Sequence, residues 1–180
     1  MLKQQISFLF LLLFLETLLH GGEKMAALHI YSPAFDNGEE IPMQYTCEGA
    51  DINPPLLWTG IKENARSLVL IVDDPDAPDP HAPKMAWVHW IVYNITPNVK
   101  ELEENVKFLP AKALEGLNDW KRTGYGGPCP PIGRHRYFFK LYTLDTSLEF
   151  KHIPTKAEVE EAMQGHIIQR AELIGLYQKH

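Results

Sequence analysis

The chain has 180 residues, of which 45% are hydrophobic and 22% are charged. This composition is too apolar for a disordered chain, and the length is too short for two ordinary domains. There are 17 Lys and Arg residues against 23 Asp and Glu residues, so the net charge is -6. A nucleic-acid partner is not expected, because such binding rests on clustered basic side chains.

An apolar run over residues 6–15 follows a short leader that contains Lys3. It is too short to cross a bilayer core, which needs about 20 helical residues, so the protein is not expected to be transmembrane. The run is typical of a secretory signal and predicts a periplasmic or secreted protein. In the alternative, Met25 is the true start of a cytoplasmic protein. Either way, residues 1–24 precede the fold and residues 25–180 form a single domain.

Short runs rich in β-branched and aromatic residues dominate the rest of the chain. The strands they predict are Ser67–Val72, Trp87–Ile95 and Arg136–Thr143, with weaker candidates at Leu28–Ser32 and Gln44–Cys47. Proline and glycine gather between these runs, which indicates many turns and argues against a helix bundle.

The C-terminal region changes its period. Thr155 and Glu158 have the spacing of a capping box, and Gly175 is a reasonable helix stop. Between them, apolar residues recur every three or four positions, at Val159, Met163, Ile167, Ala171 and Ile174. The sequence therefore predicts a mostly β domain with a C-terminal helix.

Asp74 and Asp76 directly follow the buried strand prediction that ends at Val72. Pro75 and Pro78 restrict the backbone and would hold both carboxylates in set directions. The alternative is a simple turn, because Asp and Pro are common turn residues.

Within the next strand, Trp87 and His89 are expected on one face, and Val88 and Trp90 on the other. A histidine in such an apolar strand is either a packed core residue or a functional one, and the strand alone does not decide between them.

A loop over residues 124–133, rich in glycine and proline, precedes the strand of His135 and Tyr137. Glycines such as Gly127 allow a close backbone approach, and successive N–H groups of such a loop can bind an anion. His135 and Tyr137 share one face, whereas Arg136 takes the other and is expected to pair with an acidic residue.

These segments together offer two imidazoles, at least one carboxylate and a phenol. A carboxylate beside an imidazole favours the imidazolium. We therefore predict that the segments near residues 74, 89 and 135 meet in one cationic site for a small anion, above all a phosphate ester.

The chain resembles the phosphatidylethanolamine-binding protein family, in particular its bacterial Raf-kinase-inhibitor-like branch. The resemblance covers nearly all of residues 26–180. It rests on Asp74-Pro75-Asp76-Ala77-Pro78, Trp87-Val88-His89-Trp90, Gly127-Pro128-Cys129-Pro130-Pro131 and His135-Arg136-Tyr137, with Tyr45-Thr46-Cys47-Glu48-Gly49 in support.

The resemblance implies a large central antiparallel sheet packed against a smaller one, C-terminal helical structure, and a small anion pocket at one end of the sheet. The positions that match this pocket are Asp74, Asp76, His89, Pro130, Pro131, His135 and Tyr137, and Trp87 matches a wall position. Gly127 of the glycine-rich loop is a further ligand-binding candidate. Tyr177 is a candidate for the rim. Residues 79–86 depart from the animal members, so kinase inhibition is not inherited.

The expected function is binding of a small anionic or phosphorylated ligand without catalysis and without a cofactor. The alternative is a hydrolase or metal-assisted enzyme that uses the Asp and His residues of the pocket. A third hypothesis is an inhibitor or modulator of other proteins. The sequence names no protein partner, and it leaves open whether the chain forms a homodimer.

Cys47 and Cys129 both lie in segments next to the proposed pocket. Export would allow a disulfide between them, whereas in the cytoplasm two reduced thiols are the default. The sequence leaves this choice open.

Overall fold

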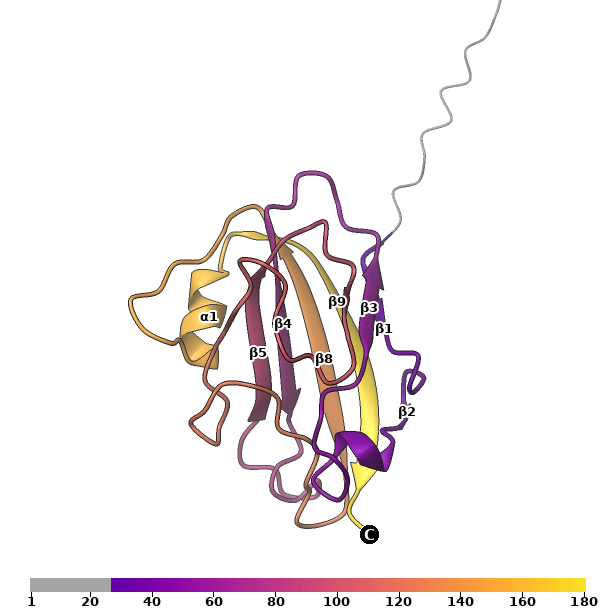
Figure 1. Cartoon of the computed structure of the whole chain (residues 1–180). Coiled ribbons are helices and arrows are strands. Elements are labelled where there is room, and N and C mark those ends of the chain that lie inside the picture. Colours follow the sequence, from indigo (N-terminus) through magenta and orange to yellow (C-terminus); the bar gives the residue numbers. More distant parts are fainter. Residues whose placement is uncertain (1–26) are drawn as a thin grey trace, which may run out of the picture.

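The computed structural model describes residues 27–180, which form two β-sheets with one α-helix beside them (Figure 1). The proposed leader over residues 1–24 lies outside the described residues. Within residues 27–180, no helix is both long enough and apolar enough to cross a membrane. The larger sheet has six strands in the order β2-β9-β8-β4-β5-β7, and the smaller sheet has three in the order β1-β3-β6.

The elements of the larger sheet are β2 (Glu39–Glu40), β4 (Ser67–Asp74), β5 (Trp87–Ile95), β7 (Leu114–Glu115), β8 (Arg134–Leu144) and β9 (Ile167–Gln178). Those of the smaller sheet are β1 (His29–Tyr31), β3 (Leu56–Thr59) and β6 (Glu101–Leu102). A 3-10 helix, η1 (Met43–Tyr45), and an α-helix, α1 (Lys156–Ala162), complete the fold.

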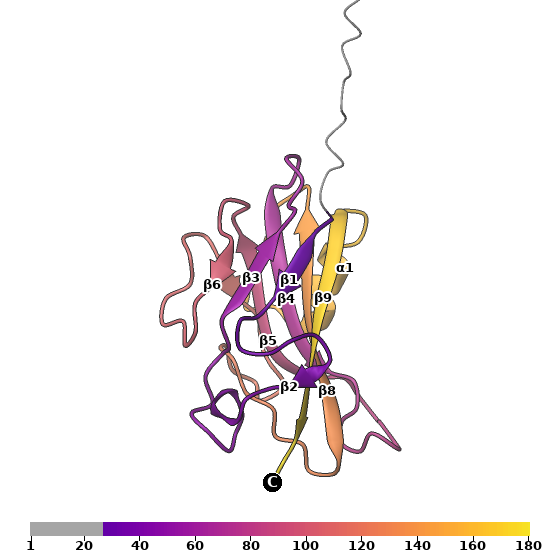
Figure 2. The ribbon, with the colours of Figure 1, turned by 90° about the vertical axis from the view of Figure 1, so that its right-hand side faces the viewer.

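The larger sheet is the middle layer, with α1 on one face and the smaller sheet on the other (Figures 1 and 2). Strand β4 is buried along its whole length, as its continuous apolar run predicts. Val69 and Ile71 pack with Val159 of α1, whereas Leu70 packs with Trp58 of the smaller sheet. Because β4 lies between β8 and β5 in the sheet, the residues at its end are held in a fixed position.

The predicted fold class is confirmed: the protein is mostly β, with a large and a small sheet and a helix in the C-terminal region. The pairs β4–β5, β4–β8 and β8–β9 are antiparallel. The short strand β2 adds a parallel pair with β9, so the larger sheet is mixed.

The predicted strand at Gln44–Cys47 is wrong, because this segment contains η1. Proline at position 42 starts a tight turn, in which the Tyr45 N–H donates to the Pro42 carbonyl at 3.0 Å. The same segment contacts the loop over residues 124–133, because the Cys47 N–H donates to the Pro128 carbonyl at 3.1 Å.

The prediction of a long C-terminal helix is also wrong beyond its first two turns. The capping box of Thr155 and Glu158 is present and α1 begins where predicted, but it ends at Ala162. Gly165 then adopts a φ of 79°, and the chain returns as β9, paired with β8 along its length. The apolar residues after Gly165 fit a helical period, but a helix here would leave the edge of β8 unpaired. Pairing as β9 satisfies the backbone N–H and C=O groups of both strands.

Candidate functional site

A β-bulge places His89 at the start of β5. Val72 pairs with Trp90 and Asp73 pairs with Val88, so His89 is the extra residue between the two pairs. A bulge turns side chains away from the regular alternation. Consequently Val88 packs on the α1 side and Trp90 packs between the sheets, and the prediction that these two share a face is wrong.

A cavity of about 320 Å³ lies where β4 ends and where β5 and β8 begin. These strand ends are at the lower end of the sheet in Figure 1. The size of the cavity suits a small ligand. Its lining residues are Asp74, Ala77, Pro78, Trp87, His89, Trp120, Cys129, Pro130, Pro131, His135 and Tyr137. The segments near residues 74, 89 and 135 therefore meet in one cavity, although they are far apart in the sequence.

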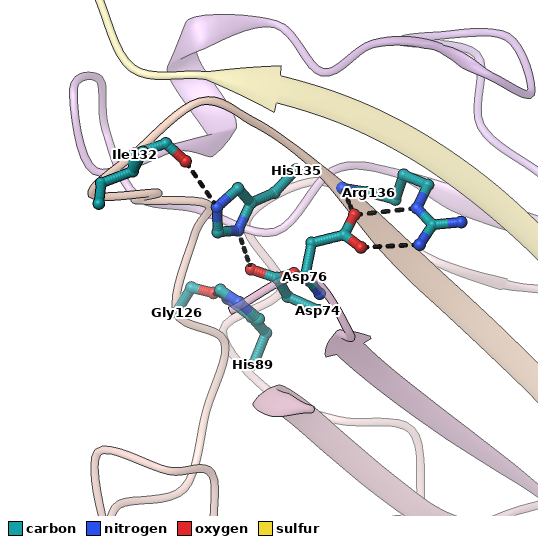
Figure 3. Close-up of polar contacts among 7 residues, drawn as sticks. All are labelled: Asp74, Asp76, His89, Gly126, Ile132, His135 and Arg136. Carbon is teal, nitrogen blue, oxygen red and sulfur yellow. Dashed lines mark hydrogen bonds and ion pairs between the residues drawn. The ribbon is translucent and has the colours of Figure 1, made fainter. Parts of the chain in front are cut away.

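Asp76 does not line this cavity. Its carboxylate accepts hydrogen bonds from the guanidinium of Arg136 at 2.9 and 2.7 Å and from the Arg136 backbone N–H at 2.9 Å (Figure 3). The hydrogen bond from Arg136 is the main cause that lowers the pKa of Asp76 below its ordinary value. This pair ties the chain after β4 to β8, so Asp76 supports the site instead of facing a ligand.

Gly127 is also outside the cavity lining, and its role is packing. Its N–H donates to Oδ1 of Asp51 at 2.6 Å. A Cβ atom there would lie 2.5 Å from the Tyr45 carbonyl oxygen and 2.8 Å from Cα of Thr46. The glycine therefore lets its loop press against the 43–51 segment, and its N–H is not available to bind an anion.

Asp74 and His135 form a buried pair across the ends of β4 and β8 (Figure 3). His135 Nδ1 lies 2.7 Å from Oδ2 of Asp74, and His135 Nε2 lies 2.9 Å from the Ile132 carbonyl oxygen. A carbonyl only accepts hydrogen bonds, so Nε2 carries a proton. Oδ1 of Asp74 accepts the N–H of Asp76 at 2.8 Å, which completes the partners of the carboxylate.

Within residues 27–180 the side chain of His89 makes one hydrogen bond, from its Nδ1 to the Gly126 carbonyl oxygen at 2.6 Å (Figure 3). Burial lowers the pKa of His89 below its ordinary value, although the bond to Gly126 and the charge of Asp74 act in the opposite direction. The expected bias of the imidazoles toward the charged form therefore does not hold for His89.

Tyr137 lies between the two histidines, with ring centroids 5.2 Å from His89 and 6.4 Å from His135. Its hydroxyl is buried and has no hydrogen-bond partner within residues 27–180. Burial is the main cause that raises the pKa of Tyr137, and nearby Asp74 adds to it, so the phenol stays protonated. An unpaired buried hydroxyl is costly unless a bound group satisfies it.

Trp120 is a cavity residue that the sequence analysis did not identify. Its ring stands edge-on to Trp87 and to His89, with centroid distances of 5.4 and 5.2 Å. Gly126 makes this position possible, because a Cβ atom there would lie 2.4 Å from the Trp120 ring. Trp120 lies in a turn of polar residues. A single tryptophan among polar residues is the one sequence signal that could have identified it as a site residue.

The structure joins Cys47 and Cys129 in a disulfide, with a Cα–Cα distance of 5.4 Å. Cys129 belongs to the cavity wall, whereas Cys47 follows η1. The hydroxyl of Tyr125 donates to the Tyr45 carbonyl at 3.1 Å and reinforces this attachment. The 124–133 loop is therefore fixed to the 43–51 segment by a covalent bond and a hydrogen bond.

Tyr177 does not reach the cavity. It is fully buried near the end of β9, and its hydroxyl donates to Oε2 of Glu48. The expected rim position for Tyr177 is therefore not found, and Trp120 is instead the exposed aromatic at the cavity.

The fold and the cavity define a class of protein: a two-sheet β domain with a small pocket, lined by polar and aromatic side chains, at one end of its central strands. The chain belongs to the phosphatidylethanolamine-binding protein family, because the family model of that description matches residues 31–178. Family membership of this kind supports a binding function in general.

Relatives and solved structures agree with this assignment. UPF0098 proteins of Methanothermobacter thermautotrophicus and Pyrococcus abyssi are 47% identical over 155 residues and 49% identical over 166 residues. The first alignment covers 84% of this chain and 99% of the relative, and the second covers 88% of each.

Among solved structures, a Chlamydia trachomatis homolog of phosphatidylethanolamine-binding protein is 45% identical, with a TM-score of 0.78 over 86% of this chain and 99% of that chain. Escherichia coli YbcL, described as a member of the mammalian family, is 30% identical, with a TM-score of 0.77 over 86% of this chain and 100% of that chain.

Proposed function

We propose that the cavity binds a small anionic or phosphorylated ligand, such as a phosphate ester or a phospholipid head group. The observation that carries this proposal is the Tyr137 hydroxyl, which is buried at the cavity without a protein partner. A ligand oxygen is the acceptor that this donor lacks. Trp87 and Trp120 provide apolar cover for the part of the ligand beyond its charged group.

The proposed activity is binding without catalysis. In the alternative, an enzyme would use Asp74, His89 and His135 as metal ligands or as acid–base groups. His135 is a poor candidate for either role, because its two ring nitrogens already face Asp74 and the Ile132 carbonyl. A metal needs a ring nitrogen with a free lone pair, and Nε2 of His135 is protonated.

We also propose a periplasmic or secreted location. The support is the Cys47–Cys129 disulfide, since such bonds persist mainly in oxidising compartments. Identification of the N-terminal residue of the natural protein tests this location. Cleavage before the described domain supports export, and a start at Met25 with reduced thiols contradicts it.

Tyr137→Phe tests the binding function, because it removes the hydroxyl alone. Titration of the wild type and the variant with phosphate and with phosphoethanolamine should show affinity at least about tenfold weaker in the variant, for one lost hydrogen bond to a charged group. Folding should not suffer, since no protein hydrogen bond is lost.

The matched control is Tyr142→Phe, which removes a phenol from the same strand outside the cavity lining. This control should bind both ligands as the wild type does. Equal affinity of the wild type and Tyr137→Phe would reject the assignment of the site, and the absence of binding by the wild type would reject the function.

A further inference from the structure

The cavity provides no permanent positive charge for an anion. None of the described residues that line it is Lys or Arg. Arg136 is on the other side of its strand and is paired with Asp76, and the Arg122 guanidinium is 5.8 Å from the Trp120 ring centroid and bonds to backbone carbonyls. Any positive charge inside the site must therefore come from an imidazole.

His135 does not provide this charge, because it is neutralised by its partner. Its Nε2 proton points to the Ile132 carbonyl, and one further proton lies between its Nδ1 and Oδ2 of Asp74. Wherever that shared proton resides, Asp74 and His135 together have no net charge. Both nitrogens of His135 are also occupied, so His135 has no donor left for a ligand.

His89 has a free ring nitrogen. The Gly126 carbonyl only accepts, so Nδ1 carries the proton of the neutral ring and Nε2 carries a lone pair. Nε2 makes no hydrogen bond within the described chain, while the ring lines the cavity and is only 3% exposed. An oxyanion facing this lone pair would be repelled, whereas a protonated Nε2 would donate to it.

The titratable and charged groups around His89 come from several elements. Asp74 and Asp73 lie at the end of β4, Tyr137 lies on β8, and Asp51 lies in the loop after η1. Asp73 is on the opposite face, where its carboxylate pairs with the ammonium groups of Lys140, at 2.7 Å, and of Lys156.

Asp51 accepts the Gly127 N–H, and Asp74 is neutralised by His135, so these carboxylates only partly favour a charged His89. Burial outweighs their combined effect and leaves the pKa of His89 below its ordinary value. The ring is therefore neutral near pH 7 when no anion is bound.

We propose that an anion binds in this cavity together with one proton taken up on Nε2 of His89, so that its affinity falls as the pH rises. This proposal rests on the proposed function. The bound oxyanion then has two donors, Nε2–H of His89 and the hydroxyl of Tyr137, whose rings are 5.2 Å apart. The site thus selects acidic ligands by proton linkage instead of by a fixed cation.

Sulfate is the appropriate probe, because it remains a dianion and brings no proton of its own near neutral pH. Calorimetric titration in two buffers of different ionisation enthalpy measures the protons taken up on binding. We expect uptake of close to one proton. We also expect sulfate affinity to fall by up to about tenfold per pH unit between about pH 6.5 and 8.5, where free His89 is neutral.

His89→Gln should abolish this pH dependence, because the amide does not titrate. His152→Gln is the matched control: His152 is exposed and pairs with Glu158, so this variant should keep the wild-type slope. If His89→Gln does not fold, NMR titration of the wild-type histidines serves instead, and sulfate should raise the pKa of His89.

The outcomes separate the two proposals. A sulfate affinity that stays constant over this pH range, no proton uptake, or an unshifted His89 titration overturns the proton coupling. Binding of phosphoethanolamine without binding of sulfate overturns it as well. All of these results leave the binding function in place. If neither sulfate nor phosphoethanolamine binds at any pH tested, the proposed function itself is wrong.

Discussion

His135 contacts Asp74 at 2.7 Å, and both side chains are buried, with exposed fractions of 0% and 5%. This contact joins the end of β4 to the start of β8, and both residues line the cavity. The pair sets the position of both residues, and together with the Ile132 carbonyl it occupies both ring nitrogens of His135. It is therefore a structural feature of the site as well as a part of its wall.

Loss of this pair should strongly destabilise the fold. His135→Ala leaves the buried carboxylate of Asp74 without its main partner, and we expect the free energy of unfolding to fall by about 3–5 kcal/mol. Urea unfolding at neutral pH measures the change. Arg134→Gln is the control: its ion pair with Glu40 is long, at 3.6 Å, and half-exposed, so it should cost less than about 1 kcal/mol. A similar loss in both variants would contradict the role of the Asp74–His135 pair.

The Arg136–Asp76 pair should make stability depend on acid pH. The hydrogen bond from Arg136 lowers the pKa of Asp76 in the folded state. A carboxyl group with a lowered folded-state pKa stabilises the fold above its unfolded pKa, and that contribution is lost as the pH falls through the folded pKa. Arg136→Gln should therefore cost about 1–2 kcal/mol at neutral pH, and the difference from wild type should shrink below about pH 4.

Unfolding curves at several pH values measure this difference. Asp76→Asn should remove the same acid-dependent contribution, and adding Arg136→Gln to it should produce little further pH dependence. A difference between the wild type and Arg136→Gln that is the same at acid and neutral pH would show that Asp76 is not responsible.

The disulfide should contribute substantially to stability, because it closes a long loop. Cys47 and Cys129 are 82 residues apart, which corresponds to about 4–5 kcal/mol in the chain-entropy model. The double variant Cys47→Ser/Cys129→Ser should lose about this free energy of unfolding. Reduction should weaken the wild type and leave the double variant unaffected.

The mass of the unreduced wild-type protein provides a direct check, since the bond lowers it by two hydrogen atoms. A mass that matches two free thiols in protein isolated without reductant would contradict the disulfide. In that case Cys129 would still line the cavity, but the attachment of its loop would rest on the hydrogen bonds to the 43–51 segment alone.

The central strands could be predicted from the sequence because their side chains determine their burial. The apolar run at Ser67–Val72 and the β-branched and aromatic run at Trp87–Ile95 form β4 and β5 with nearly the expected bounds. The alternation of His135 and Tyr137 on one side of β8 likewise follows from strand geometry, and both residues line the cavity.

Other features depended on partners far away in the chain. Residues after Gly165 carry a spacing that fits a helix, but pairing with β8 turns them into β9. The bulge at His89 arises from the register with β4, and it separates Val88 from Trp90. Gly127 looks like a residue of an anion-binding loop, yet the packing of its loop assigns its N–H to Asp51.

The sequence by itself determined a mostly β chain and the residue types of an acidic-ligand site: carboxylate, imidazoles and phenol. Only the tertiary structure decided which of them face the cavity and in which state. Asp76 is taken by Arg136, His135 is taken by Asp74 and Ile132, and burial keeps His89 neutral. Protonation and hydrogen-bond occupancy depend on neighbours and on distance from water, and these are properties of the folded chain.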